Sequence, residues 1–414
     1  MKKMLSLLLA LTMVLSLGAF ALADDPIAIT VWGAEEDQNY LSERIEAFKA
    51  AYPDQTFDIT LGVESESTAK DTILTDVEAA ADVYAFASDQ LPDLVNAGAI
   101  LDLSTVEPAL ENMAGKTLDD IKAANVEGSI TAATYNDTFY AFPFASDGFF
   151  MFYDPDYISA EQAETWEGLL DAAAAAGKKV GMTLASGWYN TAFFNAAGFS
   201  TSLNADGTTN MDWNGTSPDG YTGVQVVQAM QAIAGHEAFM AIADGDISNQ
   251  IAGGDLAAVI SGTWDTKLVS DTFGEDYEAR ALPLLTLGED QVPTRGTVSF
   301  KMIGVNPHAA QTGWAVLLAE FLTNEESQVA RFEAREIPPT NIAASESDAV
   351  QANKGVVGLT DAAAVGVVQS VGGKYWDPTA SFGEQIAQGT IGTDEAAIQT
   401  ALDQLVEGVT AAVG

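Results

Sequence analysis

The sequence predicts an α/β protein whose sheet is largely parallel. Segments that alternate between apolar and polar residues, as half-buried strands do, take turns with segments of helical periodicity. Hydrophobic residues make up 48% of the chain and charged residues only 18%, a balance typical of globular proteins with large cores. A length of 414 residues is enough for two or three domain-sized units.

The first half of the chain begins with a strand followed by a helix. Residues 27–32 alternate as a strand, and Leu41, Ile45 and Phe48 then recur at helical spacing until Tyr52-Pro53 ends the run. The elements predicted after it are strands at 57–63 and 82–86 and a short helix at 91–96, which Gly98 ends.

The same alternation resumes after Pro143. Further strands are predicted at 149–153, 180–184, 256–260, 279–282 and 298–305. Helices are predicted at 166–177, 313–321 and 394–413, the first with Thr165 as its N-cap. The turn sequences Asp206-Gly207 and Asn214-Gly215 indicate a surface hairpin. If the chain forms two lobes, we expect it to cross between them near Ala145–Asp147 and near Leu282–Pro283.

The N-terminus resembles an export signal. Lys2 and Lys3 precede an apolar region at 5–17, and Ala21-Leu22-Ala23 is a small-x-small cleavage site. We expect residues 1–23 to be a signal peptide cleaved near Ala23, so that the mature protein is secreted or otherwise extracytoplasmic. The alternative is an uncleaved membrane anchor, because residues 4–23 are free of charge and just long enough to span a bilayer.

Composition excludes several classes of function. With 17 Lys and Arg against 59 Asp and Glu, the net charge of −42 argues against nucleic-acid and anionic-lipid partners. The chain has no cysteine and only two histidines, so disulfides, thiolate chemistry and a dedicated transition-metal site are not expected. No catalytic motif is complete, and we assign no catalytic residue, metal or cofactor. Sequence alone leaves open a carboxylate pair suited to glycoside cleavage.

Five segments, in this order, resemble the solute receptors of bacterial ABC importers, in their maltose/maltodextrin-binding branch. They are the strand and loop at 29–38, the segment 81–90, the segment from Tyr140 to Asp154, the Ser261-Gly262-Thr263-Trp264 loop with its preceding strand, and the stretch 295–340. The resemblance implies a two-lobed periplasmic-binding-protein-like fold with a hinge. The N-terminal lobe would comprise 24–145 and 284–340, and the C-terminal lobe 146–283 and 341–414. It also implies a monomeric, non-enzymatic receptor that delivers its ligand to the transmembrane subunits of a permease.

The resemblance also indicates which residues would bind a sugar, whose apolar ring face needs aromatic platforms and whose hydroxyls need polar partners. The implied platforms are Trp264, Phe86, Trp188, Tyr189 and, less directly, Trp376. The implied polar contacts are Asp89, Asp147 and Glu36. Each has an ordinary alternative: the aromatic residues as core, Asp89 as a helix cap, and Asp147 as a hinge residue.

Two departures from the pattern of the branch bear on the ligand. Asp37 stands where well-known members carry lysine, and Gln90 where many carry arginine. The loss of two cations fits a neutral ligand. The leading hypothesis is therefore a receptor that closes on a neutral oligosaccharide, with maltodextrin first. The alternatives are a receptor for another neutral sugar or small solute, an exported glycoside hydrolase, and an acidic surface-layer component.

Overall fold

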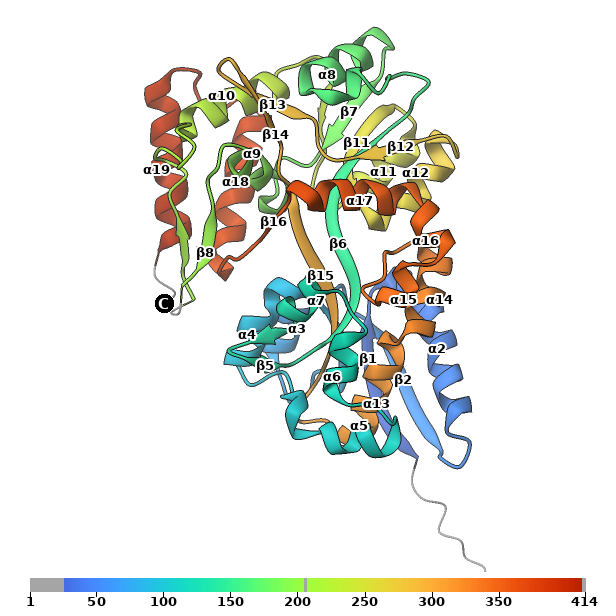
Figure 1. Cartoon of the computed structure of the whole chain (residues 1–414). Coiled ribbons are helices and arrows are strands. Elements are labelled where there is room, and N and C mark those ends of the chain that lie inside the picture. Colours follow the sequence, from blue (N-terminus) through green and yellow to red (C-terminus); the bar gives the residue numbers. More distant parts are fainter. Residues whose placement is uncertain (1–25, 205–206, 412–414) are drawn as a thin grey trace, which may run out of the picture.

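The computed structural model describes residues 26–204 and 207–411, and Figure 1 shows them as two lobes joined by long strands. The predicted signal peptide lies outside the described residues. No helix in the described part of the chain is both long and apolar enough to cross a membrane.

The N-terminal lobe is built on three parallel strands in the order β2-β1-β3. They are β1 (Ile27–Gly33), β2 (Phe57–Val63) and β3 (Val83–Ala87). Its helices are α2 (Gln38–Ala51), α3 (Ala69–Thr75), α4 (Leu91–Asn96), α5 (Glu107–Met113), α6 (Leu118–Ala123), α7 (Glu127–Ala132), α13 (Thr312–Thr323) and α14 (Glu325–Arg335). A small hairpin, β4 (Thr134–Tyr135) with β5 (Thr138–Phe139), accompanies them. β1 alternates in burial as the sequence predicts, whereas all five positions of β3 are buried.

The C-terminal lobe carries a second set of parallel strands in the order β10-β7-β11. They are β7 (Lys179–Met182), β10 (Phe239–Ala241) and β11 (Leu256–Gly262). Its shorter strands are β8 (Thr201–Leu203), β9 (Thr209–Met211), β12 (Glu278–Arg280), β13 (Leu284–Leu287), β14 (Asp290–Pro293) and β16 (Val367–Val368). Its helices are α8 (Trp166–Ala175), α9 (Gly187–Ala196), α10 (Gly223–Ala234), α11 (Ile247–Gly253), α12 (Thr266–Phe273), α17 (Lys354–Val365), α18 (Trp376–Ala387) and α19 (Glu395–Thr410), with α15 (Ile342–Ser345) and α16 (Asp348–Ala352) leading into α17.

Two strands connect the lobes and merge their sheets into one. The first part of β6 (Phe142–Tyr153) pairs antiparallel with β15 (Thr297–Val305), and its last part pairs with β11. β15 also pairs antiparallel with β3. The combined sheet is therefore mixed, because β15 runs antiparallel to β3 and β6 runs antiparallel to β11. The prediction of a largely parallel sheet holds within each lobe only.

The hydrophobic cores show where the chain changes lobe. Phe144 belongs to the N-terminal cluster and Phe149 to the C-terminal one, so the first crossing lies between them. The second crossing is in β15, not near Leu282–Pro283, because Leu285 and Leu287 pack in the C-terminal cluster. Apart from this segment, we propose the division into lobes that the sequence predicts. The predicted hairpin is formed by β8 and β9, and Asp206 in its turn lies outside the described residues.

Candidate functional site

Short segments at the carboxyl ends of parallel strands carry most of the predicted binding residues. Folds with an α/β sheet bind their ligands just beyond the carboxyl ends of the strands. In the N-terminal lobe these segments are Glu35–Asp37 after β1 and Ser88–Gln90 after β3. In the C-terminal lobe they are the start of α9 after β7, and Thr263–Asp265 after β11.

The loop that carries Glu36 is held by a buried ion cluster. Asp37 accepts hydrogen bonds from Arg331, at 2.6 and 3.0 Å, and from Arg335 at 2.7 Å. The guanidinium of Arg331 also lies 3.9 Å from the centre of the Phe144 ring, which is the geometry of a cation–π contact. Asp37 therefore fixes the loop, and leaves the neighbouring Glu36 exposed.

The segment that carries Asp89 is fixed in a similar way by Gln90. The amide of Gln90 donates to the carbonyl oxygens of Glu66 and Ser67, at 2.8 and 2.9 Å, and accepts from the backbone N–H of Lys70 at 2.9 Å. Asp89 itself is partly exposed. Burial raises the pKa of its carboxyl above the ordinary value, and the nearby Lys301 ammonium opposes that rise.

An ion pair joins the two crossing strands. Nζ of Lys301 on β15 lies 2.9 Å from Oδ2 of Asp147 on β6. Asp147 is 3% exposed, and its Oδ2 also accepts from the hydroxyl of Ser299 at 3.4 Å. Burial on its own would lower the pKa of Lys301, but the attraction of Asp147, Glu66 and Asp89 outweighs it and raises that pKa. Lys301 therefore stays charged in the middle of three carboxylates.

An aromatic ring and a hydrogen-bonded carboxylate follow β11 in the C-terminal lobe. Trp264 is partly exposed, and a Cβ placed on Gly262 would overlap its indole, so only glycine lets the ring lie against the end of β11. Next to it, Asp265 accepts hydrogen bonds from the hydroxyls of Ser261 at 2.6 Å and Ser248 at 2.8 Å.

The start of α9 adds a second group of rings. Phe149 on β6 lies 5.7 Å from Trp188 and 4.9 Å from Tyr189, measured between ring centres. Trp188 is partly exposed, whereas Tyr189 is only 6% exposed. Trp376, also partly exposed, packs edge-on against Tyr375 at 5.3 Å, and the Tyr375 hydroxyl donates to the carbonyl of Gly187 at 2.9 Å. This bond places the start of α18 beside the start of α9.

The two lobes meet at these segments. Burial raises the pKa of Asp265. The hydrogen bonds to its carboxylate oppose this rise, and the negative charge of Glu36 on the other lobe adds to it. The phenol of Tyr189 has its pKa raised by burial, and the charge of Asp147 contributes. A Cβ on Gly373 would lie 4.0 Å from Nζ of Lys70. The two lobes therefore approach each other at Lys70 and Gly373.

Comparison with known proteins decides the family. The sequence model of the family of bacterial extracellular solute-binding proteins matches residues 43–357 of this chain. The chain belongs to this family. No protein with a curated description matched the sequence.

Solved structures of solute-binding proteins share the fold over almost the whole chain. One, described as a complex with acarbose, is 26% identical, has a TM-score of 0.80, and aligns over 93% of this chain and 99% of its own. A maltodextrin-binding protein from L. casei BL23 is 22% identical with a TM-score of 0.75, over 94% of this chain and 100% of its own. A maltotriose-binding protein of Thermus thermophilus, bound to maltotriose, is 17% identical with a TM-score of 0.76, over 93% and 100%.

The prediction that Phe86 is a stacking platform in this solute-binding protein is wrong. Phe86 is 0% exposed and packs edge-on against Tyr84, with ring centres 5.9 Å apart, inside the N-terminal core. A ring without an exposed face cannot stack on a sugar. The aromatic in the middle of a short apolar strand is here a core residue.

Sequence reasoning missed three residues that shape the same region: Phe149, Asp265 and Lys301. Phe149 was hidden in an apolar run of strand, where nothing distinguishes one phenylalanine from the next. Lys301 did carry a signal, because it is the single charge in the otherwise uncharged strand Thr297–Val305. A lysine in such a position needs a buried carboxylate, which here is Asp147.

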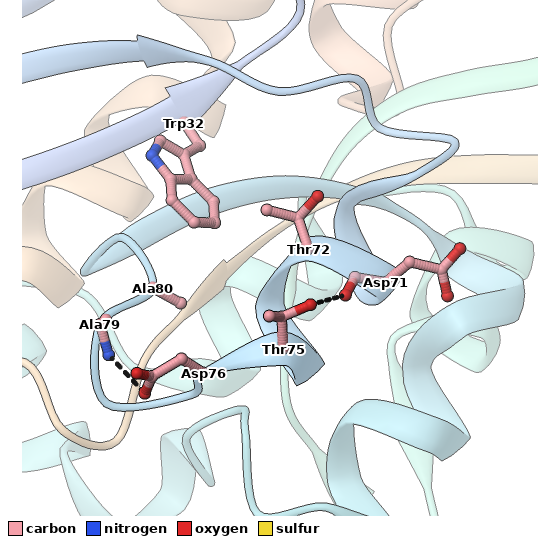
Figure 2. A pocket seen from close by; sticks show the side chains of 7 residues that line it. All are labelled: Trp32, Asp71, Thr72, Thr75, Asp76, Ala79 and Ala80. Atoms are coloured by element: carbon pink, nitrogen blue, oxygen red, sulfur yellow. Dashed lines mark hydrogen bonds between the residues drawn. The ribbon is translucent and has the colours of Figure 1, made fainter.

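Two cavities lie outside this region. One, of about 440 Å³, is lined by Trp32 and residues of α3 and the turn that follows it (Figure 2). Trp32 is partly exposed there. The other, of about 600 Å³, is lined by residues from six segments of the C-terminal lobe around Arg295. Within the described residues, no three His, Asp or Glu side chains are grouped as metal ligands.

Proposed function

We propose that this protein is the extracytoplasmic receptor of an ABC importer, and that it captures a neutral oligosaccharide between its lobes by closure and aromatic stacking. Maltodextrin, an α-1,4-glucan, is the first candidate. The observation that carries the proposal is Trp264, a partly exposed indole held against Gly262 at the end of β11.

The chemistry of the facing surfaces suits a sugar. A pyranose offers an apolar C–H face to a flat ring and hydroxyls to polar groups around it. The C-terminal lobe supplies Trp264, Trp188 and Trp376 as partly exposed rings. The N-terminal lobe supplies Glu36 and Asp89 as carboxylates with exposed surface.

The charges favour a neutral ligand. The cations of this region are already paired, since Lys301 lies 2.9 Å from Asp147 and Lys70 lies 3.3 Å from Asp93. An anionic ligand would meet unpaired carboxylates and no unpaired cation among the described side chains that we place at this site. Hydroxyl groups can donate to those carboxylates, so a polyol is the matching class.

Maltodextrin is the first candidate because the structural neighbours include proteins described as binding maltodextrin and maltotriose. Their identity to this chain is low, so the sugar is to be measured. Calorimetric titration with maltotriose, cellobiose, xylobiose and raffinose, with polyols and amino acids as further ligands, tests the ligand class. A panel in which maltotriose binds best supports the proposal. Absence of binding to every sugar in the panel would refute it.

The receptor role makes two further statements testable. A receptor returns its ligand intact, so chromatography after prolonged incubation with the bound sugar should show no shortened product, whereas a glycoside hydrolase would release one. We further propose that the protein acts outside the cytoplasm as a monomer after cleavage near Ala23. Sequencing the N-terminus of the exported protein checks the cleavage.

A further inference from the structure

The cavity at Trp32 lies on the N-terminal lobe, on the side of β1 that α3 covers (Figure 2). Its volume of about 440 Å³ falls within the range of roughly 300–1,000 Å³ that is usual for small-molecule sites. The lining residues are Trp32, Asp71, Thr72, Thr75, Asp76, Ala79 and Ala80. None of them belongs to the region between the lobes described above.

The floor of the cavity is one side of an indole. A Cβ on Gly62 of β2 would lie 2.9 Å from Cδ1 and 3.1 Å from Nε1 of Trp32, so the five-membered ring packs against that glycine. Figure 2 shows the six-membered ring projecting toward α3 and the turn at 76–80. The methyl groups of Ala79 and Ala80 add apolar surface beside it. The glycine on the neighbouring strand therefore lets the indole lie against β2 with its six-membered ring toward the cavity.

The polar groups around the indole offer both donors and acceptors. Among the described residues, the hydroxyl of Thr72 has no hydrogen-bond partner. The Thr75 hydroxyl donates to the carbonyl of Asp71 at 3.0 Å and keeps its lone pairs. Oδ1 of Asp76 accepts from the backbone N–H of Ala79 at 3.2 Å, which leaves its second oxygen available.

The charges at the cavity disfavour two classes of ligand. Its charged lining residues, Asp71 and Asp76, are both acidic. Nζ of Lys70 lies 3.5 Å from Oδ1 of Asp71, so Asp76 carries most of the negative charge that disfavours an anion. An organic cation would use the indole face and the carboxylates but has no acceptor for the Thr72 hydroxyl. A neutral polyol with an apolar face satisfies the ring, the Thr72 hydroxyl and the carboxylates together.

We propose that this cavity is a second carbohydrate-binding site, which holds one sugar ring of a neutral glycan on Trp32. This second site has the same class of ligand as the proposed interlobe site but uses none of the interlobe residues. The two proposals can therefore be tested separately. One platform with a few hydrogen bonds predicts weak binding, with a Kd on the order of 1 mM.

Nuclear magnetic resonance of the full exported chain tests the proposal. The chain has seven tryptophans, each with one indole N–H signal, and the Trp32→Ala variant identifies the signal of Trp32. On titration with maltotriose, we expect the Trp32 signal to move with a midpoint in the millimolar range. Thr72→Val should weaken this response by about two- to tenfold, as expected for the loss of one hydrogen bond. Leu74→Ala is the control, because Leu74 is exposed on the same helix and does not line the cavity.

Three results would overturn the proposal: a Trp32 signal that no sugar moves, a signal that tetramethylammonium moves and sugars do not, or a Thr72→Val variant that responds as the parent does. The interlobe site is judged from the Trp264 signal in the same spectra. A Trp264 signal that moves while Trp32 does not refutes only the second site, and the reverse refutes only the interlobe function.

Discussion

Replacing Trp264 by alanine is the most direct test of how this solute-binding protein recognises its ligand. The indole is partly exposed beside Gly262 and packs on its inner side against the C-terminal core. If one sugar ring stacks on the exposed face, the variant loses about 1–3 kcal/mol of binding free energy. That corresponds to a rise in Kd of roughly 5- to 150-fold.

The same substitution also removes packing, so the affinity must be separated from stability. Trp314→Ala is a matched control, because Trp314 on α13 is also partly buried and packs edge-on against Tyr52 and Phe57, each with ring centres 5.2 Å apart. We expect both variants to lower the unfolding temperature and only Trp264→Ala to weaken binding.

The assay is calorimetric titration of the preferred sugar, with the folded fraction of each variant checked by thermal unfolding. A Kd within twofold of the parent protein for a folded Trp264→Ala variant would refute the stacking role. Equal losses of affinity in the two variants would show that general destabilisation, and not the loss of a platform, explains the effect.

Three further predictions concern residues whose surroundings the structure defines. Phe86→Ala should destabilise the fold by about 3–5 kcal/mol, as large-to-small core changes do, and chemical denaturation measures this loss. The sugar affinity of the folded fraction, measured by calorimetry, should be unchanged. Arg331→Met should cost about 3–5 kcal/mol, because it leaves the buried Asp37 with Arg335 alone, and denaturation again measures the loss. Asp265 has its pKa raised by burial, so its contribution to stability is greatest at low pH and falls as pH rises from its ordinary value through the raised one. Asp265→Asn should therefore remove part of the decrease in unfolding free energy as the pH rises above about 4, and parallel pH curves for the parent and the variant would contradict this.

The sequence predicted the strands and helices wherever periodicity was local. The helix at 313–321 and the helix at the C-terminus appear as α13 and α19, with small shifts at their ends. Other elements had no such signal. The helix α9 is buried on nearly every side, so its residues show no amphipathic pattern that would predict a helix.

The candidate site was predictable to the extent that it depends on strand ends. Glu36, Asp89 and Trp264 all follow directly from the carboxyl ends of strands, where the fold places loops. Phe86 could not be judged in this way, because both faces of β3 are covered and a fully buried strand has no alternation to show which side faces the ligand. The ion pair between Asp147 and Lys301 could not be predicted from the sequence either, since the two residues are far apart in the chain and meet only when β6 and β15 pair.

The two residues that stand in place of cations of the related branch have a supporting role in the structure. The inference that the ligand is neutral is unchanged. Asp37 and Gln90, which stand where the related branch has basic residues, are both turned inward and hold their loops by hydrogen bonds to Arg331 and to the backbone at Glu66. Their side chains are therefore engaged in support. The cation that does reach the hinge is Lys301, and its charge is compensated by Asp147 at 2.9 Å. Because the remaining acidic groups, Glu36 among them, have no such partner among the described residues, a ligand with hydroxyl donors meets the electrostatic demand of this site better than any anion.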